Sequence, residues 1–89
     1  MEYKELLQNY REQIDTLDKE MIYLLSRRFE IVNQVWILKK ENNIIPLQKG
    51  RWEKLLAENI EVGKELGVSE EIIRDIWNRI HEESLYIEK

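Results

Sequence analysis

The first half of the chain runs from Tyr3 to Asn42 without a glycine or a proline. Apolar side chains recur along this stretch at spacings of three and four: Leu7, Tyr10, Ile14, Leu17, Met21, Leu24, Ile31, Val35 and Leu38. Such spacing is typical of one apolar stripe along an α-helix. The sequence therefore predicts a single very long helix from Tyr3 to Asn42, about 60 Å in length, which Pro46 prevents from continuing.

Two shorter helices are predicted in the second half. One begins near Gly50 or Arg51 and ends at Gly67, because glycine is common just after a helix C-terminus. The next is capped by Ser69 and continues to about Ile87. We expect this last helix to bury five apolar residues: Ile72, Ile73, Ile76, Trp77 and Ile80. No stretch alternates like a strand, so the chain is predicted to be all-α with three helices.

The predicted first helix is too long for the other two to cover. Each of them is less than half as long, and they must also pack on each other. An apolar stripe left in water over half its length would form the kind of patch that marks an interaction site. We therefore expect an intertwined homodimer of long helices. The alternative is a monomeric three-helix bundle with a broken first helix.

Length and composition exclude several classes of protein. The chain has 89 residues, enough for one domain only, which we take as residues 1–89. The net charge of -4 argues against nucleic acid as a partner. With no cysteine and one histidine, neither a thiolate nor a histidine-based metal site is expected. No apolar run is long enough to span a membrane and no signal-peptide pattern opens the chain, so we expect no membrane partner and a cytoplasmic location.

A permanent cation, Arg28, interrupts the apolar stripe of the first helix. Taken alone, it indicates a surface arginine whose stem packs along the helix. However, Lys39 lies eleven positions on and only about 20° around the helix, so both side chains can reach one small anion. Arg11 lies about 25 Å back along the helix and can reach such a ligand only in a partner chain. Three inward-facing cations predict a small dicarboxylate or phosphate ligand that neutralises them.

The run "YREQIDTLDKEMIYLLSRRFEIVNQVWILKKENNIIP" resembles the first helix of the all-helical chorismate mutases. Their pattern is roughly R-x-x-I-D-x-[IL]-D-x-x-[IL]-x-x-L-L-x-x-R, then a lysine eleven residues on and a proline after the loop. The residues that fit are Arg11, Ile14, Asp15, Leu17, Asp18, Leu24, Leu25, Arg28, Lys39 and Pro46. Arg51 resembles the arginine after the loop, and "IHEESLYIE" resembles the last-helix segment, so the resemblance covers essentially the whole chain.

This resemblance implies an isomerase that converts chorismate to prephenate by a pericyclic Claisen rearrangement, in aromatic amino-acid or related secondary metabolism. It implies an intertwined homodimer with two shared active sites, and neither cofactor nor metal. Arg28 and the partner subunit's Arg11 would bind the two substrate carboxylates. Lys39 would donate a hydrogen bond to the ether oxygen, where negative charge grows as the C–O bond breaks.

The resemblance also implies further substrate-binding residues. Arg51 follows the loop, and Ser84 is similar to a contact with a substrate carboxylate. Glu88 occupies the place of a second catalytic donor to the ether oxygen, where many bacterial members have glutamine. Without the resemblance, Ser84 would be an ordinary exposed serine and Glu88 a frayed terminal carboxylate.

Two residues depart from the family pattern. Many members read D-x-x-R-E, in which the two acidic residues contact the ring hydroxyl. Here Gln48 replaces the aspartate and Trp52 the glutamate, so Gln48 remains a candidate substrate-binding residue, while Trp52 either lines the site or packs between helices. His81 is expected to be a surface or helix-packing residue.

The sequence thus favours a chorismate mutase and leaves two alternatives. Without the acidic pair, an acceptor for the ring hydroxyl is lost. The first alternative is therefore a mutase or pyruvate lyase acting on a close relative of chorismate, 4-amino-4-deoxychorismate or isochorismate. The isochorismate-pyruvate lyases, a related branch of the same fold, also lack that pair. The second alternative is a non-catalytic helical dimerisation module, which should tolerate the loss of Arg28 and Lys39.

Overall fold

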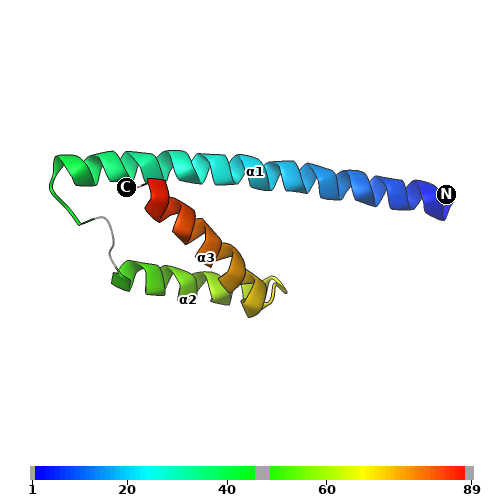
Figure 1. Ribbon diagram of the computed structural model, residues 1–89. Coiled ribbons are helices and arrows are strands. Elements are labelled where there is room, and N and C mark those ends of the chain that lie inside the picture. The colour runs from blue at the N-terminus through cyan, green and yellow to red at the C-terminus, as the bar shows by residue number, and fades with distance from the viewer. Residues whose placement is uncertain (1, 46–48, 88–89) are drawn as a thin grey trace. The chain divides into compact units, whose positions relative to one another are not determined.

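The computed structural model describes residues 2–45 and 49–87, which form three helices and, within those ranges, no strand. They are α1 (Tyr3–Glu41), α2 (Lys49–Glu65) and α3 (Glu70–Ile87) (Figure 1). The all-α prediction is confirmed, whereas Pro46 lies outside the described residues. None of the three helices is long and apolar enough to cross a membrane. The chain divides into two units, residues 1–31 and residues 32–89.

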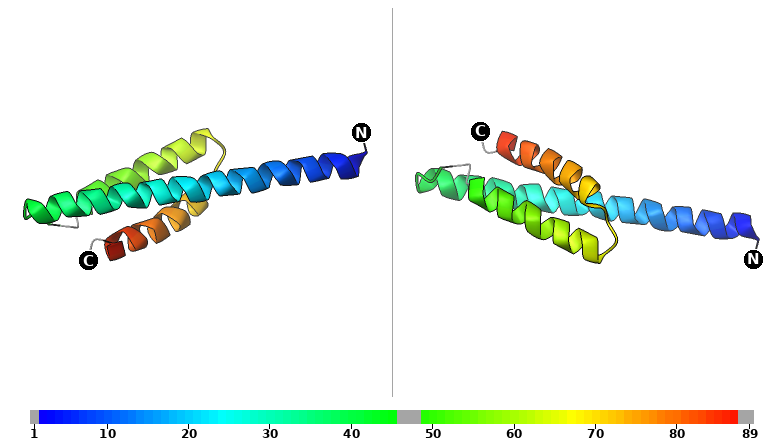
Figure 2. Two further views of the ribbon diagram at one scale, coloured as in Figure 1. Left: turned by 90° about the horizontal axis from the view of Figure 1, so that it is seen from above. Right: turned by 90° about the horizontal axis from the view of Figure 1, so that it is seen from below.

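Helix α1 is unbroken, as Figure 2 shows from two further sides. Its end is set by Asn43, whose φ of 55° puts the backbone in the left-handed region. The Ile44 N–H then donates to the Lys39 carbonyl at 2.8 Å, and the Asn43 N–H donates to the Lys40 carbonyl at 3.5 Å. This pair of bonds is the Schellman motif, which satisfies carbonyls at a helix end. The predicted single helix is confirmed, and a broken first helix is wrong.

The apolar stripe of α1 is exposed along its N-terminal part. No residue of α1 is buried. Tyr10, Ile14 and Leu17 are 55%, 56% and 57% exposed, although they recur at the spacing of a packing face. These three side chains therefore lie on an exposed apolar stripe of α1.

Helices α2 and α3 form an antiparallel hairpin closed by a tight turn. Gly67 has a φ of 79°, and the Val68 N–H donates to the Gly63 carbonyl at 2.7 Å. Glycine is favoured at this position because a Cβ atom is strained in the left-handed region. The Ser69 hydroxyl oxygen accepts from the Ile72 N–H at 3.3 Å and caps α3. The predicted roles of Gly67 and Ser69 are both confirmed.

The hairpin has a small core. Its buried apolar side chains are Ile60, Ile73 and Ile80. The helices approach closely at Gly63, where an added Cβ would lie 2.8 Å from the Cγ1 atom of Ile73. From there α2 and α3 separate toward the end of α3 (Figure 1). Glycine thus leaves room for the Ile73 side chain against α2.

The expectation that α3 buries five apolar residues is partly wrong. Ile73 and Ile80 are buried and Trp77 is partly buried, but Ile72 is 47% exposed and Ile76 is also exposed. Ile73 and Ile80 lie seven residues apart and share one face of the helix, whereas Ile72 is turned about 100° from Ile73. One neighbouring helix covers only one stripe of α3, so residues beside that stripe stay in solvent.

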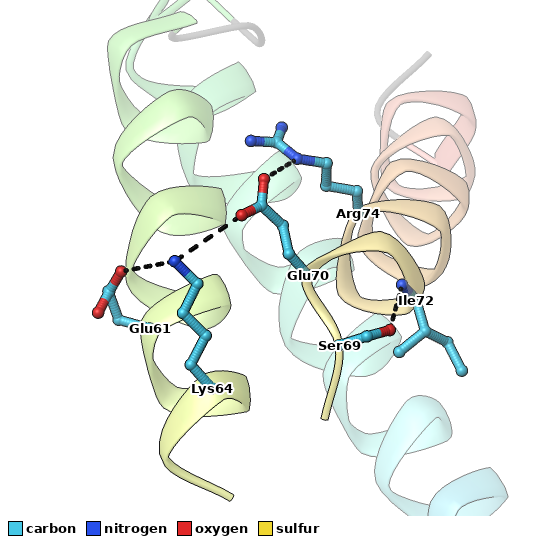
Figure 3. A network of polar contacts seen from close by, with 6 residues as sticks. All are labelled: Glu61, Lys64, Ser69, Glu70, Ile72 and Arg74. Carbon is cyan, nitrogen blue, oxygen red and sulfur yellow. Dashed lines mark hydrogen bonds and ion pairs between the residues drawn. The ribbon is translucent and has the colours of Figure 1, made fainter. Parts of the chain in front are cut away.

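An ion-pair network joins the facing ends of α2 and α3 (Figure 3). The Glu70 carboxylate accepts from the Arg74 Nε–H at 2.8 Å and lies 3.8 Å from the Lys64 ammonium. Lys64 also pairs with Glu61 at 3.6 Å. The hydrogen bond from Arg74 and the charge of its guanidinium hold the pKa of Glu70 below its ordinary value, and Lys64 adds to the effect.

Gly63→Ala should destabilise the protein. The new methyl group would overlap Ile73 Cγ1, which is not the flexible tip of that side chain, and overpacking of this kind costs about 1–3 kcal/mol. Gly50→Ala is the matched control, because nothing lies within 4 Å of its Cβ position in the same helix. It should stabilise by about 0.4–1 kcal/mol. Urea unfolding measures both changes, and equal effects would contradict the close approach.

The Glu70 network should make stability depend on pH. A carboxyl with a lowered folded-state pKa stabilises fully above its unfolded-state pKa, and that contribution is lost as the pH falls through the folded-state pKa. Glu70→Gln should therefore lower the melting temperature near neutral pH, and the difference from wild type should vanish in acid. Glu71→Gln, in the same turn of α3, is the control. A pH-independent difference for Glu70→Gln would show that the ion pairs do not contribute.

Candidate active site

Helix α1 carries two neighbouring arginines in different surroundings. Arg27 is exposed and its guanidinium pairs with Glu30 at 3.1 Å, one turn along the helix. Arg28 is partly buried. A surface pair such as Arg27 with Glu30 contributes little to stability and occupies that arginine locally. Arg28, which interrupts the apolar stripe, is therefore less exposed than its neighbour.

The same contrast recurs at the end of α1. The Lys40 ammonium lies 5.6 Å from the centre of the Trp36 ring, within the range of a cation–π interaction. Lys40 is exposed and Lys39 is partly buried. Among the charged residues of α1, all of which the structure describes, only Arg28 and Lys39 are not exposed. These are two of the three cations that the sequence singles out, and the third, Arg11, is exposed.

Arg11 lies apart from Arg28. It is exposed on α1, seventeen residues before Arg28 in one unbroken helix. At about 1.5 Å per residue, the two guanidinium-bearing positions are about 25 Å apart along the axis. A single α1 therefore does not bring Arg11 and Arg28 to one ligand.

The hairpin brings together residues from the start of α2 and the last turns of α3. The rings of Trp52 and His81 stack with their centres 4.0 Å apart and their planes 11° apart. Arg51 precedes Trp52 in the first turn of α2, and Ser84 follows His81 by about one turn of α3. The helix-packing interpretations of Trp52 and His81 are confirmed by this stack. Sequence reasoning missed that they pack on each other, since nothing local links residues so far apart in the chain.

Ser84 is partly buried and makes a contact within its own helix. Its hydroxyl donates to the Ile80 carbonyl at 2.9 Å, a common arrangement for serine inside a helix. A hydroxyl has a single proton to donate. Ser84 must therefore turn away from Ile80 before it can donate to a ligand, although its oxygen can accept a hydrogen bond as it stands.

Two predicted site residues, Gln48 and Glu88, lie outside the described residues. Within the described ranges, no group of three or more histidine, aspartate and glutamate side chains is placed to hold a metal ion. A shallow depression on α1 is lined by Asn9, Glu12, Gln13, Thr16 and Leu17, none of which is a predicted site residue. A lone helix surface of this kind has no enclosed volume, and we assign it no role.

The partly buried cations suit an anionic ligand. A guanidinium group binds a carboxylate through two parallel hydrogen bonds, and an ammonium group serves as a donor to one oxygen atom. Arg28 therefore has the chemistry of a carboxylate-binding residue, and Lys39 that of a donor to a single oxygen.

The chain is similar to known proteins over nearly its whole length. The profile of the family described as chorismate mutase type II matches residues 10–89. The T-protein of Haemophilus influenzae is 35% identical over 86 residues, which make up 94% of this chain and 22% of that protein. The T-protein of Enterobacter agglomerans is 32% identical over 74 residues, 83% of this chain and 20% of its own length.

A third relative has a different name. The bifunctional chorismate mutase/prephenate dehydratase of Buchnera aphidicola is 31% identical over 80 residues, 90% of this chain and 21% of that protein. The chain thus spans about a fifth of the length of these three relatives. No solved structure gives a significant match.

Proposed function

The chain belongs to the chorismate mutase type II family, and from this premise we propose that it catalyses the rearrangement of chorismate to prephenate. The observation that carries the proposal is the family match over residues 10–89. The partial burial of Arg28 and Lys39 supports it, because these are the cations that such a dianionic substrate requires. The proposed catalytic domain comprises residues 1–89, and we propose that it acts in the cytoplasm.

The reaction requires no covalent bond between the protein and its substrate. The ether C–O bond breaks while a C–C bond forms within the same molecule, and no proton, electron pair or group leaves the substrate. The protein therefore needs neither a nucleophile nor a general base. Its task is to hold the compact conformer in which the two carbon atoms meet, and to stabilise negative charge on the ether oxygen.

In this proposal the cations of α1 perform both tasks. Arg28 binds one substrate carboxylate, and the partner subunit's Arg11 binds the other. Lys39 donates to the ether oxygen, whose charge grows only as the C–O bond breaks. An interaction that strengthens in the transition state lowers the barrier, whereas equal binding of both states does not.

The remaining site residues complete the proposed contacts. Arg51 and Ser84 bind substrate oxygens, and Gln48 takes the place of an acidic residue near the ring hydroxyl. Glu88 donates a second hydrogen bond to the ether oxygen. It must be protonated to do so, because a carboxylate is only an acceptor.

We also propose that the active form is an intertwined homodimer. The exposed apolar stripe of α1 supports this, since a second copy offers a stripe of the same length and pattern. The 25 Å between Arg11 and Arg28 along α1 supports it too, because Arg11 then serves the partner's site. A non-catalytic dimerisation module would explain the stripe but would give no reason for two partly buried cations.

Two other compounds resemble chorismate closely enough to be alternative substrates. Chorismate, 4-amino-4-deoxychorismate and isochorismate differ in one ring substituent or its position. Gln48 and Trp52 replace the acidic residues expected to contact that substituent. We propose chorismate, with a mutase or pyruvate lyase acting on one of the other two as the alternative.

Purified protein should convert chorismate to prephenate, and two substitutions should separate binding from catalysis. Lys39→Ala should lower kcat by about a hundredfold or more while KM changes less, because its hydrogen bond matters mainly in the transition state. Arg28→Ala should impair both constants. Arg27→Ala and Lys40→Ala are matched controls, since these exposed neighbours have local partners. Product analysis with all three substrates checks the assignment, and turnover of none would show the proposed function to be wrong.

Arg28→Lys tests the geometry of carboxylate binding at that position. The charge is kept, but the two parallel donors of the guanidinium group are lost. We expect this variant to resemble Arg28→Ala in steady-state kinetics. Kinetics close to wild type would contradict a bidentate contact.

Subunit complementation tests the shared site. Arg11→Ala and Lys39→Ala chains should each be inactive alone, because every site in either homodimer lacks one cation. After the two are refolded together, a heterodimer should regain activity, since one of its two sites then has all its residues. Two affinity tags isolate the heterodimer for assay. Verified heterodimers without activity would rule out a site built from both subunits.

A further inference from the structure

The stack of Trp52 on His81 joins α2 to α3 at a distance from the turn. At the closed end, Gly63 of α2 and Ile73 of α3 are in direct contact. Toward the start of α2 and the end of α3 the helices separate (Figure 1). Trp52 lies in the first turn of α2, and its ring stacks on that of His81 with the centres 4.0 Å apart. Packed side chains between two helices resist compression, so the stack limits how closely these two segments approach.

Each ring is next to a residue of the proposed site. Arg51 is adjacent to Trp52 in the first turn of α2. Ser84 lies three residues after His81 on α3, about 60° around the helix and within about one turn. The Trp52–His81 stack therefore joins the two helix segments that carry these substrate-binding residues.

The stack differs in burial from the core of the hairpin. The buried side chains are Ile60, Ile73 and Ile80, whereas Trp52 and His81 are both only partly buried. Aromatic pairs in offset or parallel contact contribute beyond the area that they bury, and they restrict the side-chain torsions of both partners. The pair is thus placed to orient α3 relative to α2, next to the core residue Ile80.

We propose that His81 is a positioning residue, which acts through Trp52 to fix the distance between Arg51 and Ser84 and so the fit of the substrate. This inference rests on the proposed function of the site. In this inference, residue 52 does not contact the substrate through a polar group, as the glutamate of other family members is expected to do. Instead, the Trp52–His81 stack keeps α2 and α3 at a fixed distance. Loss of the stack should weaken substrate binding more than it slows the chemical step, because neither ring donates to the ether oxygen.

A double-mutant cycle tests this role. His81→Ala and Trp52→Ala should each raise KM by about two- to tenfold, the range that corresponds to one aromatic pair, with a smaller change in kcat. The double variant should be no worse than either single variant, because the stack is already lost. Ile73→Val is the control: it loosens the closed end of the hairpin and should lower stability without changing KM.

Two further substitutions at position 81 separate stacking from hydrogen bonding. His81→Phe keeps a flat ring and should retain a KM near that of wild type. His81→Asn keeps polar atoms but no ring, and should behave like His81→Ala. A KM near that of wild type for His81→Asn, together with a raised KM for His81→Phe, would overturn the inference, since His81 would then act through a hydrogen bond.

The same four proteins of the cycle should be unfolded by urea. Coupling between Trp52 and His81 in stability, together with coupling in KM, supports the positioning role. Coupling in stability with additive effects on KM contradicts it, because the stack would then be structural only. Absence of stability coupling also contradicts it. If wild-type protein converts none of the three substrates, the proposed function is wrong instead, and the stability cycle still reports whether the stack holds the helices.

Discussion

The apolar stripe of α1 is the constraint on which the rest of this protein depends. The helix is 39 residues long and contains no breaker, so it cannot fold back to cover itself. Its stripe is exposed at Tyr10, Ile14 and Leu17, where burial would contribute most of the stabilisation available to a helix. Among the described residues, the two further helices are each less than half as long as α1. The proposed homodimer follows from this exposed stripe, and the proposed sharing of active sites follows from the homodimer.

Charge within the stripe gives α1 a second role. A cation on an apolar face is unfavourable unless something neutralises it, and the favourable case is an anionic ligand. Arg28 and Lys39 are partly buried, whereas the adjacent Arg27 and Lys40 are exposed. In a reaction that needs no proton transfer, placing such cations is most of what the protein contributes.

The hairpin of α2 and α3 combines a tight end and a wide end. Gly63 permits close approach at the turn, and the Gly67 turn with the Ser69 cap fixes the connection. Farther from the turn, the rings of Trp52 and His81 stack across the two helices. In our proposal, the small residue at one end and the two rings at the other set the angle between the helices, and with it the positions of side chains in the first turn of α2 and the last turns of α3.

The sequence by itself determined the helices, because their signals are local. The absence of glycine and proline sets the length of α1, and Gly67 and Ser69 mark the hairpin turn through the backbone conformation and the hydrogen bond that each supplies. The cations at 28 and 39 were also recognisable, since helical periodicity alone puts them on one face. Tertiary structure decided which side chains meet across helices. The exposure of Ile72 and Ile76 and the stacking of Trp52 on His81 depend on how α2 lies against α3, and packing between segments distant in the chain leaves no periodic signal in either one.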